Sequence, residues 1–361
     1  MAEYLIQDTT LTAIADAVRS KTGSTASLSP SEIATEIGNI KTGFPNGTEW
    51  TQSNINTAMC HVAYGDGIWV ACSNGTGLYY STDGMTWAQS NITSGIFYYS
   101  KYGNGTWVAS SDSTGIYYST DGMTWNQSNI TDVHVNKYTS SGNVDKICFA
   151  NNIWIFASES NGIYYSTDGM TWTQSNITDR NCNSCAYGNG IFVATGNGIQ
   201  AVCISTDGIT WTMKQVGTGC YSTRIVKYAN KKFVITGSNG IYYSIDGITW
   251  TKSNLEMNAE ILMFANGIWV AAAGTIGVYY STDGMTWTQH TALSIGNMQA
   301  INNACGIWII SSSSSAYYFA NENDECRVIT SRGFYTIENA NGIWVGGNSQ
   351  GLSYSLTWAP T

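Results

Sequence analysis

The chain has 361 residues, of which 38 are Gly and only 3 are Pro, a composition that indicates many tight turns. Charged residues make up 11% and aromatic residues 13%, which excludes an intrinsically disordered protein. Fifteen Lys and Arg against 24 Asp and Glu give a net charge of -9, so no broad basic surface is available for nucleic acid.

Residues 1–43 differ from everything that follows and predict a small helical hairpin. The first helix ends at Gly23, and the segment from Ser29 to Glu32 forms a capping box with Pro30 at the first position of the second helix. Two helices of about ten residues bury too little surface between them to be stable alone. We therefore expect this segment to anchor or oligomerise the protein, with docking on the rest of the chain as the alternative. Its apolar stripes consist of Leu11, Ile14, Val18, Ile33, Ile37 and Ile40.

Two repeated units occupy the rest of the chain, residues 44–361. The first resembles Gly-Ile-Trp-Val, recurs at spacings of 36 to 47 residues, and has its aromatic residue at Trp69, Trp107, Trp154, Phe192, Phe233, Trp269, Trp308 and Trp344. The second, Ser-Thr-Asp-Gly-Met-Thr-Trp, ends at Trp87, Trp125, Trp172, Trp211, Trp250 and Trp287. Each repeat contains four short stretches with a period of two, which predicts four β-strands.

Four-stranded sheets repeated radially form a β-propeller, and eight copies of the Trp-Val strand predict eight blades, with seven as the alternative. Residues 47–55 have the sequence of a fourth strand without its first three. We expect this strand to complete the last blade and so to close the ring, leaving no open sheet edge.

The Asp of the second unit is predicted to hold a turn, because its carboxylate can accept backbone N–H groups and the Gly that follows can adopt a positive φ. A reaction centre needs one asymmetric constellation, so we assign no catalytic residue to this repeated position. The turn residues are Asp83, Asp121, Asp168, Asp207, Asp246 and Asp283.

This unit resembles the Asp-box (BNR) repeat, written Ser-x-Asp-x-Gly-x-Thr-Trp, of sialidase-like and sortilin-like propellers. In this chain Gly directly follows Asp, so the box is one residue shorter. Sialidases also need an arginine triad that begins with Arg-Ile-Pro, and none of the five Arg residues precedes Ile-Pro. The resemblance, which covers residues 47–358, therefore implies a propeller and not a sialidase.

The segment from Leu11 to Gly23, with the sequence Leu-Thr-Ala-Ile-Ala-Asp-Ala-Val-Arg-Ser-Lys-Thr-Gly, looks like the amino-terminal part of phage tail-fibre and tail-tip proteins. The resemblance implies a virion protein that contacts a tail or baseplate protein through residues 1–43. Nothing at the amino terminus has the pattern of a secretory signal, so we expect synthesis in the bacterial cytoplasm without export.

Comparing the repeats with one another gives a candidate binding surface. The turns between strands one and two and between strands three and four are nearly identical from repeat to repeat, whereas the connections on the opposite face vary. We expect that variable face to bind a host cell-surface glycan or protein. Its singular polar residues are His134, Lys137, Asp179, Arg180, Tyr221, Arg224 and His290.

Three functions follow from this organisation. We favour an adhesin in the virion tail that binds a saccharide through the variable face. A glycoside hydrolase on the same scaffold would need two carboxylates facing one pocket. The available carboxylates, none of which forms an obvious pair by spacing, are Glu256, Glu260, Asp132, Asp145 and Asp179. A structural spacer of the tail would have no polar pocket.

The nine Cys residues show no disulfide or zinc spacing, and the single Cys-x-x-Cys at Cys182 and Cys185 lacks a second pair. We expect buried free thiols, no metal and no cofactor.

The apolar stretch from Ile261 to Tyr280 contains an Asn-Gly turn, so it predicts two short buried strands rather than membrane insertion.

Overall fold

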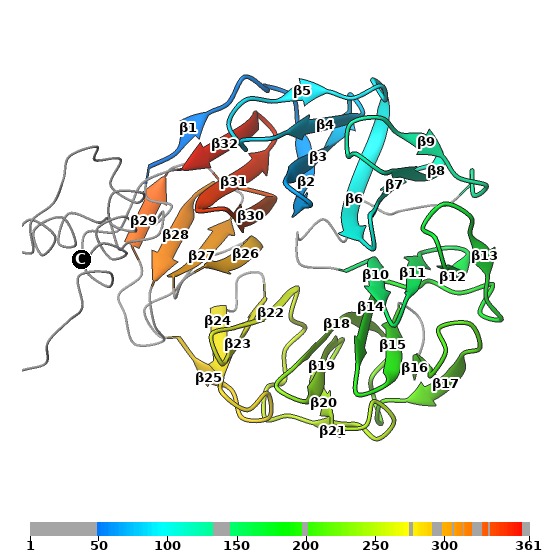
Figure 1. Cartoon of the computed structure of the whole chain (residues 1–361). Coiled ribbons are helices and arrows are strands. Elements are labelled where there is room, and N and C mark those ends of the chain that lie inside the picture. Colours follow the sequence, from blue (N-terminus) through cyan, green and yellow to red (C-terminus); the bar gives the residue numbers. More distant parts are fainter. Residues whose placement is uncertain are drawn as a thin grey trace, which may run out of the picture.

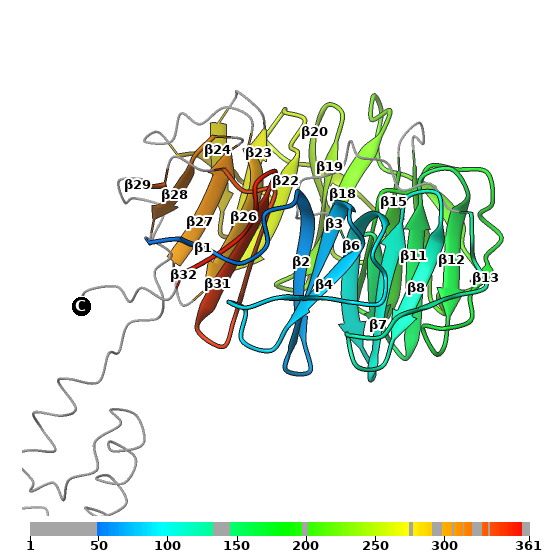
Figure 2. The ribbon, with the colours of Figure 1, turned by 90° about the horizontal axis from the view of Figure 1, so that it is seen from above.

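The computed structural model describes residues 49–132, 145–196, 201–273, 277–290, 298–304, 307–312, 314–319, 327–330 and 333–355. The predicted helices of residues 1–43 lie outside these ranges. Every regular element within them is a β-strand. The strands form sheets arranged radially around an axis (Figure 1), and the sheets stand side by side around the ring (Figure 2). This arrangement is a β-propeller and confirms the predicted all-β fold class.

The first strand of each sheet lies nearest the ring axis. A tight turn follows it, as in the first blade, where Asp66 and Gly67 adopt φ values of 49° and 78° and so fit a type I′ hairpin turn. These inner strands are β2 (Met59–Gly65), β6 (Gly95–Gly103), β10 (Ile147–Ala150), β14 (Ser184–Gly188), β18 (Thr223–Ala229), β22 (Ile261–Ala265), β26 (Met298–Ala304) and β30 (Thr336–Ala340).

The second strands carry the Trp-Val unit and are buried on both faces, because a neighbouring sheet covers each face. All six residues of Thr106–Ser111 are buried, for example. Full burial of each large apolar side chain contributes about 1.5–3 kcal/mol. These strands are β3 (Ile68–Gly75), β7 (Thr106–Ser111), β11 (Ile153–Ser158), β15 (Ile191–Thr195), β19 (Lys232–Gly237), β23 (Ile268–Ala273), β27 (Ile307–Ser312) and β31 (Ile343–Asn348).

The third and fourth strands form the outer part of each blade. The third strands are β4 (Leu78–Ser81), β8 (Gly115–Ser119), β12 (Gly162–Ser166), β16 (Ala201–Ser205), β20 (Gly240–Ser244), β24 (Gly277–Ser281), β28 (Ala316–Phe319) and β32 (Gly351–Ser355). Most of the fourth strands have only two residues: they are β5 (Ala88–Gln89), β9 (Asn126–Gln127), β13 (Thr173–Gln174), β17 (Thr212–Gln215), β21 (Thr251–Lys252), β25 (Thr288–Gln289), β29 (Arg327–Thr330) and β1 (Thr51–Gln52).

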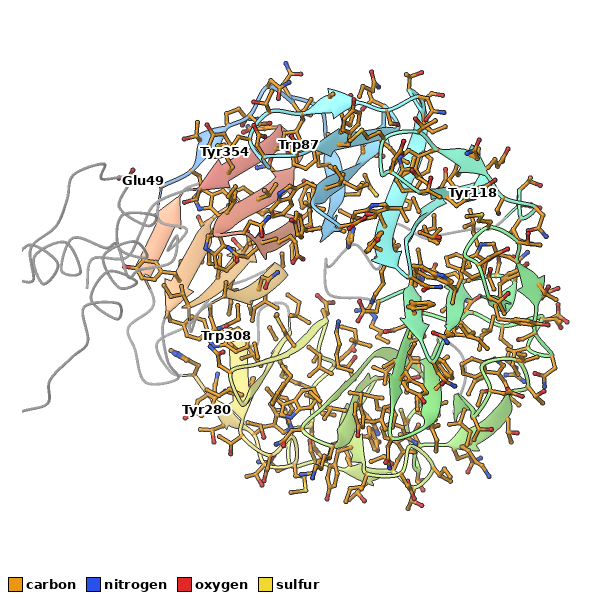
Figure 3. All side chains as sticks on the ribbon, viewed as in Figure 1. Glu49, Trp87, Tyr118, Tyr280, Trp308 and Tyr354 are labelled. Atoms are coloured by element: carbon orange, nitrogen blue, oxygen red, sulfur yellow. The ribbon has the colours of Figure 1, made fainter. Side chains whose placement is uncertain are left out.

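The Trp that ends each Ser-Thr-Asp-Gly-Met-Thr-Trp unit packs between blades. Trp125 of the second blade shares one apolar cluster with Val70 and Leu78 of the first blade. Trp87 contacts the last blade in the same way, in a cluster with Val345 (Figure 3). Burial of one large ring at each such joint couples the stability of adjacent blades.

An asparagine next to the outer strand adds a polar link across the same joints. The Asn91 Nδ2 donates to the carbonyl of Trp125 at 2.8 Å, and the Trp125 N–H donates to Asn91 Oδ1 at 2.7 Å. We call this pair of hydrogen bonds the asparagine clamp. It also joins Asn54 to Trp87, Asn129 to Trp172, Asn176 to Trp211 and Asn254 to Trp287.

The ring closes through β1, as the sequence predicts. Thr51 pairs with Tyr354 and Gln52 with Ser353, so β1 is the outer strand of the sheet that contains β30, β31 and β32 (Figure 3). The Gln52 side chain reinforces the pairing by donating to the carbonyl of Leu352 at 2.9 Å. The last blade therefore combines strands from both ends of the described chain.

Six sheets have four strands, and one has eight. The eight-stranded sheet consists of two four-stranded units, which are joined where β3 pairs with β6 through Asn74 and Ile96. The described strands thus form eight four-stranded units. That the intact ring has eight blades rather than seven stays a prediction. Electron-microscopy images taken along the ring axis will test it.

The apolar stretch 261–280 contains β22, β23 and most of β24. The described residues contain no helix that is both long and apolar enough to cross a membrane.

Candidate functional site

The face formed by the links between blades, which we call the loop face, carries several of the predicted binding residues. Asp179 and Arg180 are exposed in the link between β13 and β14. Tyr221, in the link between β17 and β18, has 64% of its surface exposed. Its backbone N–H donates to Ser238 Oγ at 3.1 Å, so the loop that presents the ring is fixed to the neighbouring β19–β20 turn.

Arg224 lies at the start of β18 on the same face. Its Nη1 is 3.3 Å from Oε1 of Glu260, which belongs to the next blade. Within the described part of the chain, no hydrogen bond or ion pair joins Arg180, Tyr221 and Arg224 to one another. These residues therefore do not form one hydrogen-bonded cluster. His134 and Lys137 lie outside the described residues.

His290 does not belong to the loop face, and this placement corrects the sequence-based expectation. Only 4% of its surface is exposed, and its ring lies 5.4 Å from the ring of Phe319. It follows β25 at the position that Ser90 and Ser253 occupy in other blades, and its N–H donates to the carbonyl of Val278. The side chain fills space between two blades, so a ligand at the surface does not reach it.

The opposite face, which we call the turn face, is formed largely by the turns of the Ser-Thr-Asp-Gly-Met-Thr-Trp units, which we call Asp-box turns after the motif that they resemble. Asp83 Oδ1 accepts hydrogen bonds from the N–H groups of Met85 and Thr86, both at 2.8 Å, and from Ser81 Oγ at 2.9 Å. Partial burial raises the pKa of Asp83, but these hydrogen bonds outweigh it and lower the pKa. The same contacts recur at Asp121, Asp168, Asp207, Asp246 and Asp283.

The turn also explains why Gly follows Asp. Gly84 has a φ of 70°, and a Cβ atom there would lie 3.1 Å from Nε1 of Trp69. Both the backbone conformation and the packing therefore favour glycine. The carbonyl of Gly84 accepts a hydrogen bond from Nε1 of Trp87 at 3.2 Å, which joins the turn to the packing between blades.

The inner strands surround a polar cavity of about 300 Å³ that the sequence analysis did not identify. The third-last residue of each inner strand occupies an equivalent position in every blade, opposite the Val of the second strand in the first two blades. Six of these eight positions line the cavity. The eight are Ala63, Lys101, Cys148, Ala186, Lys227, Met263, Asn302 and Glu338.

An ion-pair network crosses this cavity. Lys227 Nζ lies 2.6 Å from Oδ2 of Asp145, and Lys101 Nζ lies 3.9 Å from Oδ1 of the same carboxylate. His61 also lines the cavity, and its Nδ1 accepts a hydrogen bond from the N–H of Ser100 at 3.4 Å. We call the cavity with His61, Lys101, Asp145, Lys227, Asn302 and Glu338 the channel site.

The two carboxylates of the channel site have opposite pKa shifts. Burial raises the pKa of Asp145, but the ammonium groups of Lys227 and Lys101 outweigh burial and lower that pKa to about 2. Burial raises the pKa of Glu338 to about 7 in spite of the N–H of Asn339, and the negative charge of Asp145 adds to the rise. Burial lowers the pKa of His61 to about 4. At neutral pH, Asp145 is thus ionised, His61 is neutral and Glu338 is near its midpoint.

A second charged pair is buried. Lys146 Nζ lies 2.5 Å from Oε1 of Glu159, with none of the Lys146 side chain exposed.

Of the nine cysteines, the seven in the described residues are free thiols, and six of these are buried. No group of three or more His, Cys, Asp or Glu side chains in the described ranges is arranged to hold a metal ion.

Comparison with known proteins identifies the fold but not a family. No protein-family model matches the chain, and no curated protein matches it in sequence. Solved structures do match it. The computationally designed Ika8 protein superposes with a TM-score of 0.66 at 11% identity, over 88% of this chain and 100% of Ika8.

Two natural proteins illustrate the range of functions among the similar structures. YCF48 from Cyanidioschyzon merolae superposes with a TM-score of 0.52 at 11% identity, over 85% of this chain and 98% of YCF48, and YCF48 has also been solved bound to D1 peptide. The GH74 enzyme of Niastella koreensis superposes with a TM-score of 0.53 at 16% identity, over 82% of this chain but only 48% of the enzyme. At these identities the likeness shows the propeller fold alone.

Proposed function

We propose that this protein is a receptor-binding protein of a virion tail, which attaches to a host cell-surface ligand through the loop face. The observation that carries the proposal is the exposed ring of Tyr221, 64% accessible on a loop whose backbone is tied to Ser238. A large aromatic side chain held in solvent by a fixed loop is typical of a binding surface. Among the described residues, the large hydrophobic side chains exposed on the turn face, such as Ile245 and Ile248, are aliphatic and provide no aromatic platform.

A saccharide is the ligand class that the loop face fits best. An aromatic ring provides a stacking platform for a sugar, and Arg180 and the Arg224–Glu260 pair provide directed donors and acceptors. A protein receptor is the alternative ligand on the same face. In this proposal, residues 1–43 attach the propeller to a tail or baseplate protein, or to further copies of the chain, and the protein is located in the virion.

The test compares cell binding by the full-length protein and by single variants. We expect Tyr221→Ala and Arg180→Ala to reduce binding to intact host cells and to glycans on an array, with unchanged melting temperatures because both side chains are exposed. Ile248→Ala is the matched control, since Ile248 is 42% exposed on an Asp-box turn of the opposite face. Equal loss of binding in the control would place the receptor site on the turn face instead.

A glycoside hydrolase is the second candidate, because Asp145 and Glu338 line one cavity and have opposite pKa shifts. The Asp145 carboxylate, however, lies 2.6 Å from Lys227, and this ion pair makes it a weak nucleophile or base. We therefore propose that the protein does not cleave glycosides. Turnover of aryl glycosides that Glu338→Gln abolishes would contradict this proposal. The polar cavity also argues against a purely structural spacer.

A further inference from the structure

We propose that the channel site binds a small hydroxycarboxylate of the uronic acid class, with the ligand carboxylate held by the ammonium groups of Lys101 and Lys227. This inference goes beyond the receptor-binding function. The lining residues belong to the inner strands and the residue that leads into β10, and none is among the loop-face residues assigned to the receptor.

The size of the cavity selects a small ligand. About 300 Å³ lies at the lower end of the range for small-molecule sites, which suits a single sugar ring and excludes a folded partner. Apolar side chains such as Met263 and Ile301 line part of the wall, and charged and amide side chains line the rest. Such a mixture suits a ligand with a carbon ring and several polar substituents.

The charge distribution selects an anion. Asp145 forms a close pair with Lys227 at 2.6 Å, but Lys101 is 3.9 Å away, beyond hydrogen-bond distance. In the described part of the chain, the Lys101 side chain makes no other ion pair or hydrogen bond, although Asp145 raises its pKa and keeps it charged. One ammonium group thus has all of its N–H donors available to a carboxylate in the cavity.

The remaining polar groups select hydroxyl substituents. Glu338 and Asn302 lie on adjacent inner strands, β30 and β26, and both line the cavity. The Nδ1 of His61 accepts the Ser100 N–H, so the neutral ring carries its proton on Nε2, which is left to donate. The Asn302 amide is already held by the protein, because its Nδ2 donates to the carbonyl of Ile337 at 2.9 Å and its Oδ1 accepts the N–H of Asn303 at 2.7 Å. Glu338 and His61 are therefore the groups left for a ligand. A hydroxyl group both donates and accepts, so it can satisfy a carboxyl and an imidazole N–H. An unsubstituted carboxylate would leave them to water.

Protonation of Glu338 couples ligand binding to pH. The charged and titratable groups that line the cavity with Glu338 are His61 and Tyr64 of β2, Lys101 and Tyr102 of β6, Asp145, and Lys227 of β18. With Glu338 ionised, the two lysines and two carboxylates sum to zero. With Glu338 protonated, the sum is +1, so an anion binds more tightly as the pH falls through about 7.

The experiment titrates the full-length protein with D-glucuronate and measures binding by isothermal titration calorimetry. At pH 6 we expect saturable binding of glucuronate, and binding at least about tenfold weaker for D-glucose and for inorganic phosphate. Equal binding of phosphate would show a general anion site and overturn the hydroxycarboxylate assignment, as would the absence of glucuronate binding.

Two variants test the residues, each with a charge-matched control at the exposed outer pair Lys252–Glu256. We expect Lys101→Gln to weaken glucuronate binding at least about tenfold and Lys252→Gln to leave it unchanged. Raising the pH from 6 to 8.5 should weaken binding by the wild type about tenfold or more, whereas Glu338→Gln should keep tight binding at both values. Glu256→Gln should retain the wild-type pH dependence.

Equal affinities of the Lys101→Gln and Lys252→Gln variants would overturn the carboxylate assignment, provided that both melt as the wild type does. If Lys101→Gln does not fold, the Glu338→Gln variant tests the site instead. A wild-type pH dependence of glucuronate binding in Glu338→Gln would also contradict the proposed site. Tyr221→Ala should bind glucuronate normally. Failure of the receptor-binding proposal is therefore distinguishable from failure of this one.

Discussion

The turn face and the channel site are built from the same repeats. Equivalent positions hold the same residue at the turn face but different residues at the channel site. At the turn face, one Asp accepts the same backbone N–H groups in blade after blade. At the channel site, equivalent positions hold residues as different as Lys101, Met263 and Glu338. Repetition therefore marks the residues that build the scaffold, and variation at an equivalent position marks residues that are free to serve a ligand.

The physical reason lies in the neighbours of each position. An Asp-box side chain must satisfy the N–H groups of its own turn, and this requirement is the same in every blade. A side chain that lines the channel lies among other channel residues rather than in the joints between blades, so the packing between blades does not restrict it. Changes at the ring closure, the joints and the turns should therefore destabilise the fold, whereas changes in the channel should not.

The largest effect is expected from opening the ring. Deletion of residues 49–56 removes β1 and leaves β32 without its outer partner, so cooperative thermal unfolding should be lost. Calorimetry on the purified variant measures this. A variant lacking only residues 1–40 is the control, and it should unfold like the wild type if the propeller is an independent domain. A cooperative transition near the wild-type temperature in the first variant would show that β1 is dispensable.

Breaking one asparagine clamp should cost less. Asn129→Ala removes two hydrogen bonds, both at 2.8 Å, between adjacent blades, which corresponds to about 2 kcal/mol of the free energy of unfolding. Chemical denaturation of the variant gives this value. Asn126→Ala, three residues earlier on the exposed strand β9, should change the free energy by less than about 0.5 kcal/mol. Equal losses in the two variants would mean that the clamp contributes little.

A single Asp-box turn should matter still less, because water can replace the lost hydrogen bonds at the surface. We expect Asp121→Ala to lower the free energy of unfolding by about 1 kcal/mol. The same carboxylates give an acid dependence. Their pKa values are lowered in the folded state, so their contribution is present above the unfolded value of about 4 and is lost as the pH falls below it.

The acid dependence can be measured as the difference in melting temperature between pH 7 and pH 3 for the wild type and for Asp121→Ala. The variant should lose less stability on acidification, since it lacks one of the groups that must be protonated. A larger loss in the variant would contradict the role of Asp121 in the turn.

The smallest effect on stability is expected in the channel. Lys101 keeps 40% of its side chain exposed and lies 3.9 Å from Asp145, so Lys101→Gln should change the free energy of unfolding by less than about 0.5 kcal/mol. Denaturant titration tests this. A decrease in the free energy of unfolding of more than about 2 kcal/mol would mean that Lys101 stabilises the fold. The channel and the turn face would then not differ in their contribution to stability.

The repeated features of the fold could be predicted from the sequence because each is local. The Asp, Gly and Trp of one turn lie within five residues of one another, and the alternation of apolar residues marks each strand. Closure through residues 47–55 could also be predicted, because that segment is recognisably a fourth strand without its first three.

The channel site could not be assembled in this way. Its residues come from strands far apart in the chain, such as Lys101 on β6 and Lys227 on β18, and only the curvature of the ring brings them together. A signal did exist: the third-last residue of each inner strand changes from repeat to repeat. The prediction that His290 lies on the loop face was wrong for a related reason. His290 occupies the position of Ser90 and Ser253 in other blades, and this position packs between blades and does not belong to a loop.

The pairing of β1 with β32 has a consequence for biosynthesis. Thr51 and Tyr354 are about 300 residues apart, so at about 5–20 residues per second the ribosome needs roughly 15–60 s to make the partner after the first strand has emerged. During that time the early blades can form one by one, but the segment that completes the last blade stays unpaired. During synthesis we therefore expect the earliest propeller strand to pair with the latest one only after most of the ring is in place.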